Sequence, residues 1–253
     1  MRCFIFAGRT MKELLRDPLS YIFCIGFPIV MLIIMTIVNK SIPKAAGMTV
    51  FRIDNLAPGI AFFGLTFVML FTALQVSKDR TTSFMTRLYA TLMTPVDFIV
   101  GYTIPVVIVA LLQQVITFIA SSVIALLSGV VLELGNIILC MIMLLPSAIL
   151  FIAFGLFFGV LLNDKASPGI CSIIISAAGM LGGVWMDLEA IGGTFQRVCS
   201  VLPFYPGVKT ARSAMSGEWQ EMGQELMIIL LYAIVLYILS ILVFIKKMKS
   251  DKK

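Results

Sequence analysis

The sequence KDRTTSFMTRLYATLMTP, residues 78–95, is the longest polar interruption in the first half of the chain and separates two apolar runs of membrane length. At a helical period its bulky residues fall on one side, namely Phe84, Met85, Leu88, Tyr89 and Leu92. The opposite side carries Arg80, Ser83, Arg87, Ala90 and Thr94. We therefore predict a short basic amphipathic helix, which ends at Thr94 because the residue before a proline is disfavoured in the helical region. A helix of this kind between two membrane spans offers a surface on which a partner in the cytosol could act.

The composition places the rest of the chain in a membrane. Of its 253 residues 60% are hydrophobic and only 13% are charged, and the mean hydropathy of +1.06 lies far outside the range of soluble domains. A membrane-spanning helix needs about 20 consecutive apolar residues. Six runs meet this length: residues 19–38, 56–77, 98–128, 136–162, 166–186 and 226–245. The sequence therefore predicts an all-α integral membrane protein with six transmembrane helices in a single transmembrane domain, residues 1–253.

The first 17 residues predict a helix that lies in the membrane interface. Its apolar face holds Phe4, Ala7, Met11, Leu14 and Leu15. The opposite face holds Arg2, Arg9, Lys12, Glu13 and Arg16. The apolar run that follows is too long for a cleaved signal peptide, so we expect this helix to be retained.

The basic residues predict the orientation. With the N-terminus inside, 13 of the 19 lysines and arginines lie in inner segments and the other six in outer ones. Lys and Arg favour the cytoplasmic side, so we expect both termini to be cytoplasmic.

Several kinds of chemistry are missing from the sequence. The chain has no histidine, which excludes Ser-His-Asp catalysis and HExxH zinc sites, and it has no G-x-x-x-x-G-K-[ST] phosphate loop. The six predicted spans contain no Asp, Glu, Lys or Arg, whereas ion-coupled transporters usually keep an ionisable residue in the membrane. If the protein transports, its energy is expected to arrive through the cytosolic surface, although channels and facilitators can also lack such charges.

The polar residues within the spans allow two interpretations. Gln75, Gln113 and Gln114 either line a substrate path or form hydrogen bonds between helices. Gly155-x-x-x-Gly159 and Gly179-x-x-x-Gly183 match the small-residue pattern for close helix approach, within one chain or between two copies. The five cysteines suggest neither a disulfide framework nor a metal site.

The outer connection, residues 187–225, is too apolar for a free loop. It contains an apolar-periodic piece followed by Pro203-Phe204-Tyr205-Pro206. We expect it to re-enter the membrane or to lie on the outer leaflet. Its aromatic residues either anchor it at the interface or form an outer gate, for which the candidates are Phe195, Leu202, Phe204 and Tyr205.

The order of these features resembles the ABC-2 type permease family, the membrane subunits of ATP-binding-cassette exporters. After the N-terminal helix the matching pieces are Leu56-Ala57-Pro58-Gly59, Asp79-Arg80, Leu92-Met93-Thr94-Pro95, Gly101, Gly183, Leu202-Pro203-Phe204-Tyr205 and Val208-Lys209-Thr210-Ala211-Arg212. Together they cover nearly the whole chain. The sequence departs from the family at Tyr102, where a lysine is common.

The resemblance implies a type V exporter-like permease in a bacterial cell membrane. Two permease subunits would pair as a homodimer or a heterodimer, each docking a separately encoded ATPase through residues 78–95. ATP and Mg would bind to the ATPase, no cofactor to this chain, and nucleic acid would not be a partner. The implied contact residues are Arg80, Phe84, Arg87, Leu88 and Leu92.

We expect a hydrophobic or amphipathic cargo, such as a drug, an antibiotic or a lipid. An ATP-independent channel or facilitator is the alternative. A membrane enzyme or assembly factor is disfavoured by the absence of histidine and of charges in the predicted spans.

Overall fold

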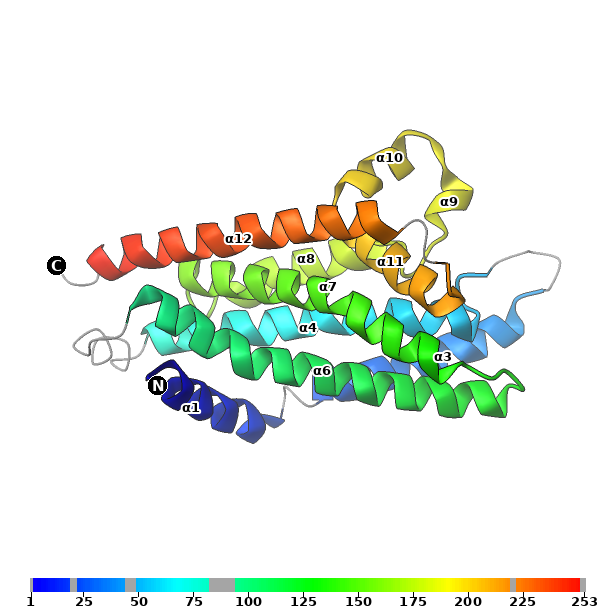
Figure 1. The fold of residues 1–253 in the computed structure, drawn as a ribbon, viewed down its shortest axis with the longest axis horizontal. Helices are drawn as coiled ribbons and strands as arrows, with labels where there is room; N and C mark the ends of the chain where they lie inside the picture. The colour runs from blue at the N-terminus through cyan, green and yellow to red at the C-terminus, as the bar shows by residue number, and fades with distance from the viewer. Residues whose placement is uncertain (1, 19–21, 44–48, 82–93, 219–221, 251–253) are drawn as a thin grey trace.

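The computed structural model describes residues 2–18, 22–43, 49–81, 94–218 and 222–250. All regular secondary structure within these ranges is helical (Figure 1). The elements are α1 (Arg2–Arg16), the π-helical η1 (Ile22–Gly26), α3 (Phe27–Ser41), α4 (Ile53–Thr81), α6 (Pro95–Leu127), α7 (Leu134–Leu161), α8 (Ser167–Leu181), α9 (Leu188–Ile191), α10 (Gly193–Val201), α11 (Phe204–Ser216) and α12 (Met222–Ser250).

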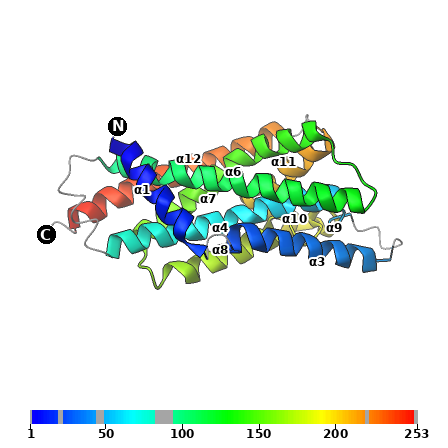
Figure 2. The same ribbon diagram turned by 90° about the horizontal axis from the view of Figure 1, so that it is seen from below.

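The long helices lie side by side along one axis, and both termini are at the same end of the bundle (Figure 1). Within the described ranges, five helical stretches are long and apolar enough to cross a membrane: Ile22–Ser41, Ile53–Arg80, Pro95–Leu127, Leu134–Leu161 and Met222–Lys247. Helix α1 runs obliquely across the bundle (Figure 2).

The apolar run predicted at residues 166–186 contains a shorter helix than expected. Helix α8 has 15 residues, a length of about 22 Å against a hydrocarbon core of about 30 Å. It ends before Gly182-Gly183, and Gly183 has a left-handed φ of +70°, a conformation that terminates helices. Gly179-x-x-x-Gly183 is therefore not a helix-packing motif, because its second glycine lies beyond the helix.

Helix α4 is the centre of the bundle. In its most apolar stretch of 18 residues 83% of the residues are buried, against 17–50% in the corresponding stretches of the other four candidate spans. Two glycines of α7 allow the close approach of these helices. A Cβ atom at Gly155 would lie 2.6 Å from the carbonyl oxygen of Met69, and one at Gly159 would lie 2.8 Å from that of Ala73. The Gly155-x-x-x-Gly159 pattern thus packs two helices of the same chain.

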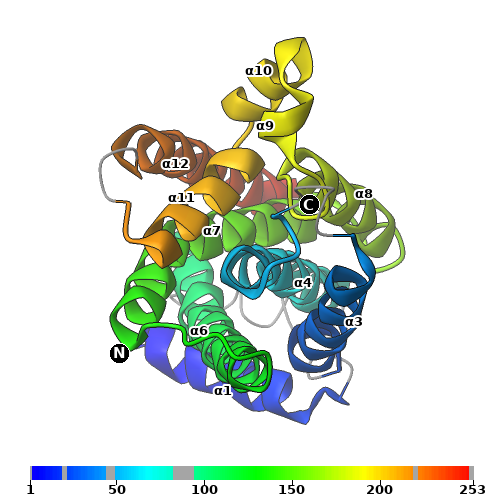
Figure 3. The ribbon, with the colours of Figure 1, turned by 90° about the vertical axis from the view of Figure 1, so that its right-hand side faces the viewer.

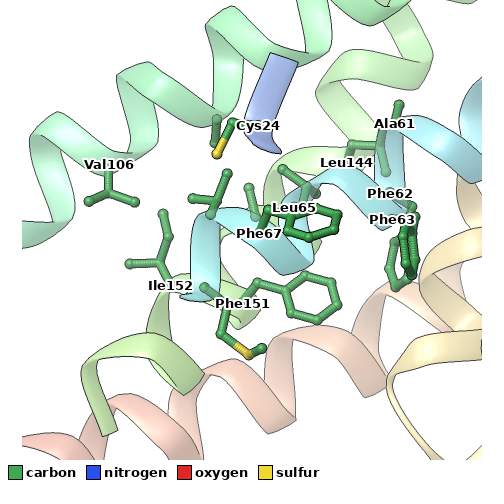
Figure 4. Close-up of a cluster of buried hydrophobic side chains, with 14 of the residues drawn as sticks. Cys24, Ala61, Phe62, Phe63, Leu65, Phe67, Val106, Leu144, Phe151 and Ile152 are labelled. Atoms are coloured by element: carbon green, nitrogen blue, oxygen red, sulfur yellow. The ribbon is translucent and has the colours of Figure 1, made fainter. Parts of the chain in front are cut away.

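Aromatic side chains fill the core around α4 (Figure 4). Phe67 of α4 contacts Phe27 of α3, with ring centroids 4.8 Å apart. Phe62 meets Phe151 of α7 edge to face at 5.3 Å. Lipid tails are as apolar as these rings, so close packing rather than exclusion of water holds them together within a membrane.

Prolines stand in several of the helices that we predicted as membrane spans, and one of them adjoins an irregular turn. Pro28 stands in the first turn of α3, directly after the π-helical turn η1. A proline lacks the N–H group and crowds the preceding turn, which favours such an irregularity at this point. Helices α6 and α7, in contrast, continue through Pro105 and Pro146.

Residues 187–225 include three short helices with different surroundings. Helices α9 and α10 project from the bundle (Figure 3), and the apolar residues Ile191, Phe195 and Val198 of this part are 40–54% exposed. Helix α11 instead packs into the bundle, where nine of its 13 residues are buried.

The stretch 78–95 is described at its two ends. Residues 78–81 continue α4 instead of starting a new helix. Thr94 has extended backbone, as expected before a proline, and is the N-cap of α6. Its hydroxyl accepts from the backbone N–H of Asp97 at 3.2 Å, and the Asp97 carboxylate accepts from the backbone N–H of Thr94 at 2.9 Å. This capping box, with Pro95 in the first turn, fixes where α6 begins.

Candidate functional site

A network of polar side chains joins α1, α4 and α6 near the end of the bundle that carries the termini. Its centre is Asp79 of α4, whose side chain is only 6% exposed. Arg9 of α1 donates to both carboxylate oxygens, at 3.1 Å to Oδ1 and 3.3 Å to Oδ2. Tyr102 of α6 donates its hydroxyl to Oδ2 at 2.8 Å. One carboxylate therefore connects three helices.

Two further side chains extend this network. Glu13 accepts from Arg9 at 2.6 Å and from the amide nitrogen of Gln75 at 2.6 Å. Gln75 also reaches Asp79 at 3.4 Å. Arg9 and Glu13 are four residues apart on α1, and Gln75 and Asp79 are four apart on α4, so each pair lies on one face of its helix. The contact between α1 and α4 is thus made by two facing pairs of polar side chains.

The electrostatics of the network favour a permanent ion pair. Burial by itself lowers the pKa of Arg9, but the hydrogen bond and charge of Asp79 and the charge of Glu13 outweigh it, so this pKa lies above its ordinary value. The guanidinium stays charged and forms a bidentate charge-assisted bond, among the strongest polar contacts in proteins.

Phe6 fixes α1 against α6 beside this ion pair. Its ring meets Tyr102 edge to face at 4.9 Å and Phe98 at 5.5 Å. Gly101 leaves room for it, since a Cβ atom there would clash with Cδ1 of Phe6. Arg9 lies 5.9 Å from the centre of the Phe6 ring.

The buried face of α1 differs from the predicted apolar face. Its buried residues are Phe6, Ala7, Thr10 and Leu14. Phe4 and Leu15, which the prediction placed on the apolar face, are 67% and 51% exposed. The polar contacts with α4 explain the difference, because Arg9 and Glu13 must turn toward the bundle to reach Asp79 and Gln75.

A cavity of about 910 Å³ opens beside the network, between α1, α4 and the turn after α7. Its charged lining residues are of both signs: Arg9, Glu13, Arg16, Asp17, Lys78, Asp79 and Asp164. The cavity is as large as many ligand sites, and it adjoins the end of α4 from which residues 82–93 continue.

The predicted contact residues fall mostly outside the described ranges: Phe84, Arg87, Leu88 and Leu92 lie there. Arg80 is described, and its Nη1 donates to the carbonyl oxygen of Leu162 at 3.4 Å. This oxygen lies just after α7, where a cation also interacts favourably with the helix dipole. Arg80 therefore ties α4 to the end of α7.

The three predicted path glutamines lie in two places. Gln75 belongs to the polar network, whereas Gln113 and Gln114 are buried in the middle of α6 at 1% and 0% exposure. Gln113 donates to Oγ1 of Thr117 at 3.2 Å. Neither amide atom of Gln114 has a hydrogen-bond partner among the described residues. Burying an unsatisfied polar group costs about 1–3 kcal/mol, so Gln114 weakens the fold where it stands.

The four predicted gate residues are separated in the structure. Phe204 packs inward against Phe151 at 6.2 Å, and Leu202 packs against the same core. Phe195 is 40% exposed on α10. Tyr205 donates to Glu189 at 3.0 Å, and burial together with the charge of Glu189 raises the pKa of Tyr205 to about 12.

Sequence reasoning did not identify Arg9 and Tyr102 as partners of Asp79, or Glu13 as a partner of Gln75. The spacing of four residues within each pair was visible, as was an acid two residues after the end of an apolar run. Arg9 and Asp79 are 70 positions apart, however, and no local pattern pairs them.

These features define the class of the protein: an all-helical, multi-span membrane protein whose charged groups gather at the ends of its bundle. A family model described as ABC-2 family transporter protein matches residues 44–242, which is most of the chain. The chain therefore belongs to the ABC-2 transporter family. Comparison with curated proteins gives no match.

Proposed function

We propose that this chain is the permease subunit of an ABC exporter of the bacterial cell membrane, and that it moves a hydrophobic or amphipathic substrate such as a drug, an antibiotic or a lipid. ATP and Mg act on a separate ATPase subunit, and two permeases pair as a homodimer or heterodimer. Residues 1–253 form one membrane domain with six membrane helices, of which α8 is the shortest, and with both termini in the cytoplasm. Family membership and the distribution of basic residues support this proposal.

The observation that carries the proposal is the bond between Arg9 and Asp79 next to residues 82–93. Helix α4 continues without a break from Ile53 to Thr81, about 43 Å, so a displacement at its end is transmitted along the whole bundle. Residues 82–93 connect α4 directly to the capped start of α6. A force on this segment therefore moves α4 and α6, and through Asp79 it also moves α1. Rigid-body motion of this kind is how two distant sites are commonly coupled.

The interior supports an apolar cargo. Gln113 and Gln114 are buried amides among apolar residues of α6. On this proposal both side chains contact the substrate during transport. This accounts for the amide of Gln114, which has no hydrogen-bond partner among the described residues. Residues 187–225 form the outer gate, with Phe195 on its exposed part.

The test is a purification of the tagged chain from its own host in mild detergent. A soluble ATPase is expected to co-purify with the wild type and to be lost from the double variant Leu88→Asp/Arg87→Glu. The matched control is Arg52→Glu, which reverses an exposed charge at the other end of the bundle and should retain the ATPase. If no ATPase accompanies the wild type and the pure chain alone supports flux into liposomes, the protein is a facilitator instead.

A further inference from the structure

A second cavity, of about 710 Å³, lies between α10, α11 and α12 at the end of the bundle away from the termini. It takes no part in the network around Asp79. Its volume suits one bound molecule of moderate size. The cavity has an apolar wall and a polar rim, which together indicate what it binds.

Helix α12 supplies the apolar wall. Its lining residues follow one stripe at helical spacing: Gln224, Glu225, Ile228, Leu231, Tyr232 and Val235. From Glu225 to Val235 the stripe covers about 15 Å, which is half of a hydrocarbon core of about 30 Å. The stripe lies within the candidate span Met222–Lys247, so its apolar part is at the depth of the acyl chains of one leaflet.

The polar rim of the cavity carries a cation, Arg197, and a carboxylate, Glu225, one of whose oxygens can accept a further hydrogen bond. Arg197 of α10 is exposed and forms no ion pair with a described residue. Glu225 pairs with Lys209 at 3.0 Å through Oε1, but its Oε2 is buried and has no hydrogen-bond partner in the described part of the chain. A buried carboxylate oxygen without a donor is unfavourable, so a ligand that brings an N–H group would be stabilised there.

We propose that this cavity binds a phospholipid with a primary ammonium in its headgroup, phosphatidylethanolamine. The phosphate lies at Arg197, the ammonium donates to Oε2 of Glu225, and an acyl chain follows Ile228, Leu231 and Val235. A soluble ligand would leave the apolar wall unmatched, and phosphatidylcholine has no N–H group for Glu225. The argument for this site does not rest on the proposed transport function, although Arg197 and Glu225 belong to the segment 187–225 that we propose as the outer gate.

Native mass spectrometry tests the headgroup contacts. The purified protein is first equilibrated with equal amounts of phosphatidylethanolamine, phosphatidylcholine and phosphatidylglycerol, and the lipids that remain bound are then identified. The wild type is expected to retain phosphatidylethanolamine preferentially. Glu225→Gln should reduce its preference over phosphatidylcholine about tenfold, the effect of one hydrogen bond to a charged group. Arg197→Ala should instead weaken retention of all three lipids alike, because each carries the phosphate.

A matched pair of variants tests the acyl-chain wall. Leu231→Trp enlarges a side chain of the cavity lining, whereas Ile234→Trp places the same ring at a similarly exposed position of α12 outside the lining. Lipid should be lost from the first and kept by the second, and Val235→Trp replaces Leu231→Trp if that variant does not fold. Equal retention of phosphatidylethanolamine and phosphatidylcholine by the wild type, or equal lipid on both tryptophan variants, would overturn the proposal.

Discussion

Arg9→Ala is expected to destabilise the protein by about 2–3 kcal/mol and to release α1 from the bundle. The substitution removes two donors from Asp79, whose side chain is 6% exposed. Removing one partner of a fully buried ion pair costs about 3–5 kcal/mol. We expect the smaller loss of about 2–3 kcal/mol because the Arg9 side chain is 30% exposed and because Tyr102 and Gln75 still donate to the Asp79 carboxylate.

The measurement combines global and local unfolding. Denaturant midpoints in detergent give the free energy of unfolding for Arg9→Ala, Asp79→Ala and the double variant, and the cycle isolates the pairwise energy. We expect a coupling of about 1–3 kcal/mol. Amide hydrogen exchange should increase in residues 2–16 but not in α7, which separates release of α1 from a general loss of stability.

The control is the ion pair Arg52–Asp54, which has a similar distance of 2.8 Å but side chains that are 61% and 39% exposed. Exposed pairs contribute about 0–1 kcal/mol, so Arg52→Ala should change little. If Arg9→Ala is no more destabilising than Arg52→Ala, or if the cycle gives less than about 0.5 kcal/mol, the ion pair does not hold α1 and the reasoning fails.

Three other substitutions test the packing and the remaining polar contacts. Gly155→Ala should lower the free energy of unfolding by about 1–3 kcal/mol, because the added methyl group would meet the main chain of α4. The control is Gly135→Ala in the same helix, where a methyl group has open space; it should be neutral in a thermal shift assay. Tyr102→Phe should lower it by about 1.5–3 kcal/mol through the lost bond to the carboxylate, and an unchanged denaturation midpoint would exclude that bond. Gln114→Leu should raise the melting temperature, since it removes unsatisfied polar atoms, and it should lower transport if the amide contacts the substrate. A raised melting temperature with unchanged transport would show that Gln114 does not contact the substrate.

Much of the helical arrangement was predictable from local properties. Five of the six long apolar runs and the N-terminal amphipathic segment contain helices whose bounds lie within a few residues of the predicted ones, because length and hydropathy decide which segments can span a bilayer. Helix α8 was the exception: hydropathy does not show that Gly182 and Gly183 end the helix, since that depends on backbone conformation.

The polar network was less predictable, because burial depends on tertiary partners. Asp79 was placed outside the predicted span, yet it lies in the last turns of α4 and is buried. Its charge is tolerated there only because Arg9 and Tyr102 reach it from other helices. The face of α1 was misjudged for the same reason, since helical periodicity treats Arg9 and Glu13 as solvent-facing groups.

The two ends of α4 are held in similar ways, and this limits how the bundle can move. At one end the Asp79 carboxylate accepts from Arg9; at the other, Arg212 of α11 donates from Nε to the carbonyl oxygen of Asn55 at 3.2 Å. Between them α4 is one unbroken helix against the glycines of α7. A displacement of α4 must therefore break these bonds or carry α1 and α11 with it. Because nine residues of α11 are buried in the bundle, moving α11 as a body is favoured over breaking its contacts. On the proposed function, a force applied at residues 82–93 thus moves α4 and, through Arg212, α11. This coupling needs no charged residue in the middle of the membrane.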